Sequence, residues 1–348
     1  MLLHRSMKCK HQFNLFSRKW SDTLYSWQTS NWQKLTDSQK NKRLAHGLLF
    51  YGTGGTGKKD FATEFAHWLL CEQPLADKAC GECKSCHLIQ GESHPDFLHL
   101  FPEEAGKAIK VDQVRELIEK MSFTSHTQGY RVILISPADA LNANASNSLL
   151  KTLEEPPANT ILILVTDKPS KLMATIRSRT QMIRFDLPES EQSIQWLSQQ
   201  NIDQAELALN LCAGAPLAAI EMVSEDGLQI RDKLFKNWQE LAAGNADALE
   251  SAAMWVKDGF KVKENLPLNW VSSWILDMIR SLQGGHSESM VNTDYAQSLQ
   301  NLAGQVDLKS VYGLLDRLND TIRLSDTSAN QQMLVEGFLL HWSGLKRS

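Results

Sequence analysis

One stretch constrains the fold of this chain more than any other: residues 48–60, which read LLFYGTGGTGKKD. A short apolar run leads into a glycine-rich loop with the spacing of a Walker A motif, and a helix-like segment follows. Glycines permit backbone conformations in which successive N–H groups converge on an anion, and the helix N-terminus adds its dipole. The sequence therefore predicts a strand, a phosphate-binding loop and a helix. The candidate nucleotide- or phosphate-binding residues are Gly52, Gly55, Gly57 and Lys58.

The metal that accompanies a bound nucleotide has lost its ligands in this sequence. A Walker A motif continues with Ser or Thr, whose hydroxyl holds Mg²⁺, but the residue here is the cation Lys59. The strand expected at 131–136 should end in acids that order the metal and polarise water, and the residues are Ser136 and Pro137 instead. Asp139 is expected to cap a helix. The sequence predicts no catalytic magnesium. It leaves open whether the loop binds ATP or phosphate, or is a glycine-rich turn that matches by chance.

Four of the six cysteines lie close together, in the pattern C-x₈-C-x₂-C-x₂-C. Two-residue spacers let consecutive thiolates face one ion, and four thiolates in tetrahedral geometry are what structural zinc prefers. Disulfide bonds are one alternative, which a chain without a secretory signal is not expected to form. An iron–sulfur cluster is another, although its C-x₂-C-x₂-C run is usually followed by Cys-Pro. The sequence predicts a structural zinc knuckle at 71–86, with the ligands Cys71, Cys80, Cys83 and Cys86.

Strand and helix patterns alternate in the first half of the chain, whereas the second half is helical. Apolar residues at helical spacing mark helices on both sides of the Walker A strand and at 111–121, and further strands are expected at 97–101, 131–136 and 161–165. This alternation is typical of a parallel α/β sheet. From Pro188 onward the apolar stripes have helical spacing only, which indicates an all-α part.

Composition and charge exclude some classes of function. With 348 residues the chain is long enough for two or three domains. Its formal charge of −4 argues against a protein whose main activity is to bind nucleic acid. No window reaches the roughly 18–20 apolar residues of a membrane span, so we expect a cytoplasmic protein with no membrane partner. Residues 1–24 are expected to be a disordered N-terminal extension, with an organelle signal or a start assigned too far upstream as alternatives.

A longer run of residues carries a resemblance to a known family. Three segments resemble the signature of clamp-loader AAA+ subunits, namely LLKTLEEPP at 149–157, ILILVTDKPSKL at 161–172 and IRSRT at 176–180. The cysteine knuckle and a His-Pro-Asp step that begins at His94 are similar to bacterial members of this family. His94 itself is expected in a loop or at the surface, with no assigned role. The resemblance is strongest over residues 48–188.

The resemblance implies an arginine finger. Family members carry a Ser-Arg-Cys motif whose arginine reaches the ATP of a neighbouring subunit, and the matching residues here are Ser178, Arg179 and Thr180. Arg179 is therefore the candidate catalytic residue, acting in trans, and an ordinary surface charge is the alternative. Thr166 matches the sensor 1 position of the family, where we expect a structural role. Glu154 is expected at a solvated helix end.

The resemblance also implies how the chain is divided. An AAA+ RecA-like α/β domain is expected at 25–187, with the zinc knuckle inserted in it. A small helical lid is expected at 188–228, and a helical collar domain for oligomerisation at 229–348. Active members place a sensor 2 arginine in the lid, but this chain reads Pro-Leu-Ala-Ala at 216–219. A third group that handles nucleotide is therefore missing.

The resemblance and the lost metal ligands together favour a non-catalytic clamp-loader subunit of the bacterial DNA polymerase III holoenzyme. Such a subunit supplies a trans arginine finger and a rigid scaffold, in a five-subunit ring with gamma/tau-like and delta-like subunits that loads the sliding clamp at primed DNA. An ATP-hydrolysing motor subunit of the gamma/tau type is the first alternative, and it would need the missing magnesium ligands. A zinc-knuckle nucleic-acid-binding protein is the second, and it would need a basic, aromatic-rich surface around the knuckle, where the charges are mixed.

Overall fold

The computed structural model describes residues 24–104, 106–122, 129–260, 266–285, 289–325 and 329–345. The chain forms two compact units, and the boundary between them falls after Leu187. Of the N-terminal extension predicted at 1–24, all but Leu24 lies outside the described residues. Leu24 is half-buried against the core of the first unit.

A five-stranded parallel sheet forms the centre of the first unit, in the order β2-β3-β4-β1-β5. The strands β3 and β4 are buried along their whole length, as the continuous apolar runs of parallel sheets usually are. The predicted parallel α/β fold is confirmed. The strands are β1 (Gly47–Gly52), β2 (Phe97–Leu100), β3 (Arg131–Ile135), β4 (Thr160–Thr166) and β5 (Gln181–Phe185).

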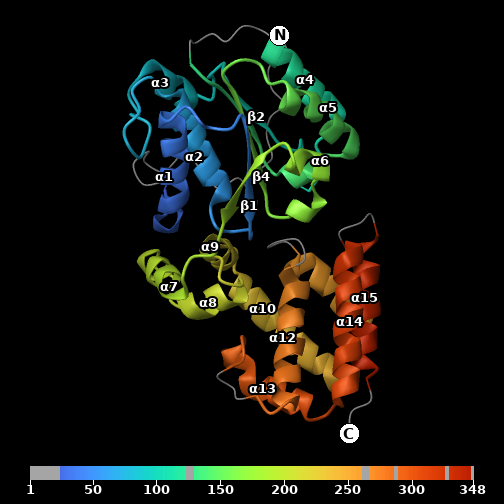
Figure 1. Ribbon diagram of the computed structural model, residues 1–348. Helices are drawn as coiled ribbons and strands as arrows, with labels where there is room; N and C mark the ends of the chain where they lie inside the picture. Colours follow the sequence, from blue (N-terminus) through green and yellow to red (C-terminus); the bar gives the residue numbers. More distant parts are fainter. Residues whose placement is uncertain are drawn as a thin grey trace, which may run out of the picture. The chain divides into compact units, whose positions relative to one another are not determined.

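Helices cover both faces of this sheet (Figure 1). Because successive side chains of a strand point to opposite faces, Phe50 of β1 packs against Phe61 on one face while Leu49 belongs to the core on the other. The first face carries α1 (Thr29–Lys40) and α2 (Lys58–Leu70), and the second carries α4 (Val111–Ser122), α5 (Ala143–Glu154) and the short α6 (Ala174–Arg177).

The strand order places a topological switch point beside β1. The chain leaves β1 toward the face of α2 and leaves β4 toward the face of α6, and these two connections lead to strands on opposite edges of the sheet. Open α/β sheets bind ligands at such a switch point, outside the carboxyl ends of the strands. The glycine-rich loop follows β1 at this edge.

The second unit consists of helices and their connections in its described residues. One apolar core joins them, from Leu197 to Trp342, and two of its tryptophans, Trp238 and Trp342, stack with ring centroids 4.0 Å apart. The predicted all-α part is confirmed. The helices are α7 (Ser190–Gln199), α8 (Ala205–Leu211), α9 (Pro216–Ser224), α10 (Gly227–Ala242), α11 (Ala248–Met254), a π-helical turn (Trp255–Gly259), α12 (Leu266–Leu282), α13 (Ala296–Ala303), α14 (Leu308–Ser325) and α15 (Gln331–Ser343).

The predicted boundary between lid and collar, after residue 228, falls inside α10. Residues on both sides of it contribute to the same core. The division of the second unit into lid and collar therefore stays a prediction.

A buried polar cluster fixes the segment before α13. Asp277, fully buried on α12, accepts hydrogen bonds from the backbone N–H groups of Val291 (3.1 Å) and Asn292 (2.9 Å). The side chain of Asn292 also donates to Asp277, at 2.7 Å. Arg231, 1% exposed, donates to Asn292 (2.7 Å) and Asp294 (2.6 Å). Each buried charge thus has an ion-pair partner in the chain, Asp294 for Arg231 and Arg280 for Asp277, as buried charges require.

No single helix in the described part of the chain is long and apolar enough to cross a membrane. The bent pair of α8 and α9 passes this test by length and composition only, and its buried side chains belong to the core of the second unit.

Candidate functional site

The loop after β1 has a backbone that requires glycine. Gly52 has a φ of 146°, Gly55 of 77° and Gly57, the N-cap of α2, of 82°. A Cβ at Gly52 would lie 2.2 Å from the carbonyl oxygen of Phe185, and a Cβ at Gly57 would lie 2.6 Å from the ring of Tyr25. The loop therefore has the glycine-dependent shape of a phosphate loop at the N-terminus of a helix.

The chain itself binds the ammonium of Lys58. Its Nζ lies 2.7 Å from Oδ1 of Asp167 and donates to the carbonyl oxygen of Thr53 at 2.5 Å. The side chain of Lys58 is 3% exposed, and that of Asp167 is 57% exposed. Asp167 directly follows β4, which pairs with β1, so its carboxylate reaches the loop where both strands end. The charge that would face a phosphate is already paired with a carboxylate.

A second group of residues, from the segment before α1, contacts the loop and the start of α2. The indole Nε1 of Trp27 and the amide Nε2 of Gln28 both donate to the carbonyl oxygen of Thr56, at 3.1 and 2.9 Å. The hydroxyl of Tyr25 donates to Asp60 on α2 at 3.1 Å, and the rings of Tyr25 and Trp27 stack at 4.8 Å. These residues lie just before and within a 3₁₀ turn (Ser26–Gln28). No pattern in the sequence indicates these contacts.

The end of β3 offers no magnesium ligand in the expected place. Ser136 is buried, and Pro137 has no side-chain donor atom for a metal. Asp139 is not the helix N-cap that we expected, because it lies inside a 3₁₀ turn (Ala138–Ala140) and accepts a hydrogen bond of 2.6 Å from the hydroxyl of Thr166. Thr166 thus has a structural contact. Among the described residues, the cluster of His, Cys, Asp or Glu that could hold a metal lies elsewhere.

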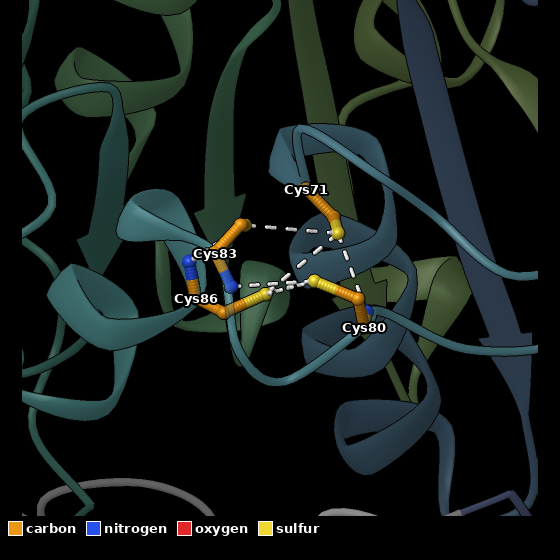
Figure 2. A group of neighbouring side chains, drawn as sticks. All are labelled: Cys71, Cys80, Cys83 and Cys86. Carbon is orange, nitrogen blue, oxygen red and sulfur yellow. Dashed lines mark hydrogen bonds between the residues drawn. The ribbon is translucent and has the colours of Figure 1, made fainter.

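That cluster is formed by Cys71, Cys80, Cys83 and Cys86 (Figure 2). The sulfur–sulfur distances are 3.9 Å from Cys71 to Cys83, 3.8 Å from Cys80 to Cys86 and 3.7 Å from Cys71 to Cys86. A zinc ion with Zn–S bonds of about 2.3 Å at the centre of a tetrahedron requires sulfur–sulfur distances of about 3.8 Å. The four thiols therefore have the size and chemistry of a structural zinc site.

Backbone N–H groups turn toward the sulfur atoms of the knuckle. The N–H of Cys83 donates to the sulfur of Cys80 at 3.4 Å, and the N–H of Cys86, in the short helix α3 (Lys84–Gln90), donates to Cys83 at 3.4 Å. Hydrogen bonds from the N–H groups of Glu82 and Cys83 lower the pKa of the Cys80 thiol to about 6, whereas burial raises the pKa of Cys86. N–H donors stabilise a thiolate, which is the form that binds a metal.

His94 joins the knuckle to the sheet. It is 6% exposed, and its Nδ1 accepts the backbone N–H of Asp96 at 3.1 Å. Its Nε2 therefore carries the proton and donates to the hydroxyl of Ser85 (2.9 Å), which in turn donates to the carbonyl oxygen of Leu70 (2.6 Å). Burial lowers the pKa of His94, which favours this neutral form. His94 lies in a loop, as expected, but the expected surface position was wrong, because a single histidine beside a proline has no periodicity that reports burial.

Arg179 lies between α6 and β5, where it pairs with Glu154 at the end of α5. The Nε and Nη2 atoms of Arg179 lie 2.8 and 2.6 Å from Oε1 of Glu154, and Nη1 donates to the carbonyl oxygen of Thr175 at 3.1 Å. The side chain of Arg179 is 35% exposed. The expectation that Glu154 ends a solvated helix missed this ion pair.

Arg179 and the phosphate loop lie at opposite ends of β1. The carbonyl oxygen of Arg179 lies 3.3 Å from the position of a Cβ on Gly47, the first residue of β1, whereas the loop follows Gly52, the last. At about 3.3 Å per residue, the length of the strand separates them by about 16 Å. Arg179 therefore lies away from the phosphate loop of its own chain.

The fold and these sites define a class of protein: an AAA+ chain whose phosphate-loop lysine is paired with a carboxylate of the same chain and whose first unit carries a four-cysteine knuckle. The sequence profile described as DNA polymerase III, delta subunit, matches residues 27–189, and a second profile, for the C-terminal part of the delta subunit, matches residues 225–344. The chain belongs to the family of the delta prime subunit of DNA polymerase III.

Two relatives support this assignment. The chain is 34% identical to the DNA polymerase III subunit delta prime of Pseudomonas aeruginosa over 328 residues, which cover 92% of this chain and 98% of the relative. It is 31% identical to the protein of the same name from Escherichia coli over 325 residues, or 91% and 94% of the two chains. Among solved structures, a gamma subunit-related protein of Thermotoga maritima aligns with 90% of this chain and 99% of its own, at 14% identity and a TM-score of 0.46.

Proposed function

We propose that this chain is a clamp-loader subunit of DNA polymerase III that completes the ATP site of a neighbouring subunit and hydrolyses no ATP itself. The observation that carries the proposal is the contrast between the two ends of strand β1. At the carboxyl end Asp167 pairs with Lys58, and the described residues at the end of the neighbouring strand β3 offer no magnesium ligand in the expected place. At the amino end Arg179 is partly exposed. The family membership of the chain supports the same assignment.

The partners in this proposal are other clamp-loader subunits of the gamma/tau and delta types, arranged in a five-subunit ring. The ring loads the sliding clamp onto primed DNA, and the chain acts on clamp and DNA through the complex. In this arrangement residues 188–228 act as a lid and residues 229–348 as the collar that holds the ring together. The helical core of the second unit supports such a rigid role, because a close-packed core transmits position without deforming.

Zinc has a structural role in the proposal. Cys71, Cys80, Cys83 and Cys86 would close all four coordination positions of the ion, which leaves no open position for a substrate. The knuckle would then hold the end of α2 and the start of α3 together, while the chemistry takes place at the subunit interface.

The test is the substitution Arg179→Ala in a reconstituted clamp loader. A trans arginine neutralises charge that develops on the transferring phosphoryl group, and in measured systems it contributes roughly 10³- to 10⁵-fold to the rate. Because a clamp loader has several ATP sites, we expect total DNA- and clamp-stimulated ATP turnover to fall by less, and clamp loading to slow. Arg179→Lys should restore little, because an ammonium lacks the planar fork of donors.

The matched control is Arg184→Ala, an exposed arginine of β5 that pairs with Asp186. Zinc content and ring assembly should be unchanged in both variants. Unchanged turnover and loading with Arg179→Ala would show that Arg179 is only a surface charge. ATP hydrolysis by the isolated chain, abolished by Lys58→Ala, would instead favour a motor subunit.

A further inference from the structure

We propose that Glu154 is a positioning residue for the arginine finger: it holds the guanidinium of Arg179 in one orientation before a neighbouring ATP site arrives. This inference rests on the proposed function. It adds a second residue to the site, and it assigns a function to the conspicuous acidic end of α5.

The contacts of the guanidinium carry the proposal. Both Nε and Nη2 of Arg179 lie within 2.8 Å of the same oxygen of Glu154, so that the carboxylate fixes one edge of the planar group. Nη1 donates to the carbonyl oxygen of Thr175 at 3.1 Å and to the hydroxyl of Ser178 at 3.4 Å. All three nitrogens of the guanidinium therefore contact groups of the chain: Glu154 at Nε and Nη2, and Thr175 and Ser178 at Nη1.

Donor capacity of the guanidinium remains for a phosphate oxygen. An arginine has five N–H bonds, of which the hydrogen bonds use one on Nε and two on Nη1. The N–H bonds of Nη2, which contacts Glu154 as an ion pair, are left, and the side chain is 35% exposed. The ion pair thus orients the guanidinium without using all of its donors.

Glu154 is itself held firmly enough to orient another side chain. It is the last residue of α5, whose preceding residue Leu153 is 1% exposed in the core. The carbonyl oxygen of Leu153 accepts a hydrogen bond of 2.9 Å from Nε2 of His46, directly before β1. The next backbone N–H, that of Glu155, donates to Lys151 within the same helix end. The carboxylate therefore projects from a fixed backbone.

Orientation matters here because a free arginine has many rotamers. A side chain that is ordered only on docking loses that freedom at the interface, whereas one held beforehand does not. The opposite role, a lock that keeps Arg179 away from phosphate, is disfavoured because the ion pair leaves donor capacity on Nη2 and the side chain is 35% exposed. Glu154 should therefore help the reaction.

The experiment compares Glu154→Ala with its neighbour, Glu155→Ala, in the reconstituted clamp loader. Alanine is compatible with a helix end, so both variants should fold, assemble and bind zinc alike. With Glu154→Ala we expect the Arg179-dependent part of ATP turnover to fall roughly threefold to tenfold in kcat, as expected when orientation is lost but charge is kept. KM for ATP should not change, and Glu155→Ala should match the wild type. Glu154→Gln, which keeps an acceptor oxygen, should be intermediate.

A double-mutant cycle makes the assignment specific. If Glu154 acts through Arg179, then Glu154→Ala should have no further effect in the Arg179→Ala background. An equal extra loss in that background, or faster turnover with Glu154→Ala, would overturn the inference. If Arg179→Ala lowers turnover and Glu154→Ala does not, only the positioning role fails. If Arg179→Ala itself has no effect, the proposed function fails.

Discussion

Lys58 keeps its position in the phosphate loop, but its charge is paired with Asp167. The two residues are far apart in the sequence, so the motif predicts the loop and not the carboxylate that pairs with its lysine. A signal was present, because an acid directly after a strand that neighbours β1 must lie at the carboxyl edge of the sheet. The pairing of Lys58 with Asp167 follows only from the strand order, which no local pattern in the sequence contains.

Asp167→Ala should make the loop accessible to an anion. Inorganic pyrophosphate is the probe, because it needs no room for a base beneath Trp27 and Gln28. Removing a competing charged hydrogen-bond partner should strengthen its binding by roughly 10- to 100-fold, as measured by isothermal titration calorimetry. Lys58→Ala should cancel the gain, and Asp112→Ala, on an exposed surface, should have no effect. Equal binding by Asp167→Ala and the wild type would mean that the contacts of Trp27 and Gln28 alone close the loop.

At the level of elements, strong periodicity predicted most of the first unit. The helix α2 and the buried strands β3 and β4 follow their apolar patterns closely. The edge strand β5 was missed, because its exposed residues leave little alternation to detect. The helix α3 was missed because it is short and begins inside the cysteine cluster. The cysteine spacing predicted which side chains come together, but not how the knuckle is fastened to the sheet.

Ser85→Ala should weaken that fastening while leaving the metal site intact. The hydroxyl of Ser85 joins His94 to Leu70, and its loss leaves a buried donor and a buried acceptor without their partner. The free energy of unfolding of the first unit should fall by about 1–3 kcal/mol, as measured with urea. Zinc content should stay near one ion per chain, by elemental analysis. Ser93→Ala, an exposed serine nearby, is the control. Zinc lost from the Ser85 variant would place this serine in the metal site instead.

At the scale of the whole molecule, the chain consists of two units with separate apolar cores. The first unit combines the sheet with the knuckle, and the second relies on tryptophans and on the buried cluster around Asp277. The sequence predicted the change from α/β to all-α at Pro188. It did not predict the buried cluster, because the segment around Asn292 reads as a polar loop although Asn292 is fully buried. Polar residues that satisfy one another inside a core have no apolar signature.

Because each unit has its own core, thermal unfolding should show two transitions, and a substitution should shift the transition of its own unit. Cys83→Ser removes one of the four proposed zinc ligands and should lower the transition of the first unit. Asp277→Ala removes the acceptor of three hydrogen bonds from Val291 and Asn292 and the ion-pair partner of Arg280, and it should cost the second unit about 3–5 kcal/mol, or a shift in Tm of roughly 6–20 °C by calorimetry. Asp320→Ala, an exposed acid of α14, should shift neither transition. A single transition that both variants lower together would show that the two units unfold as one, and the separation of their cores would then have no thermodynamic meaning.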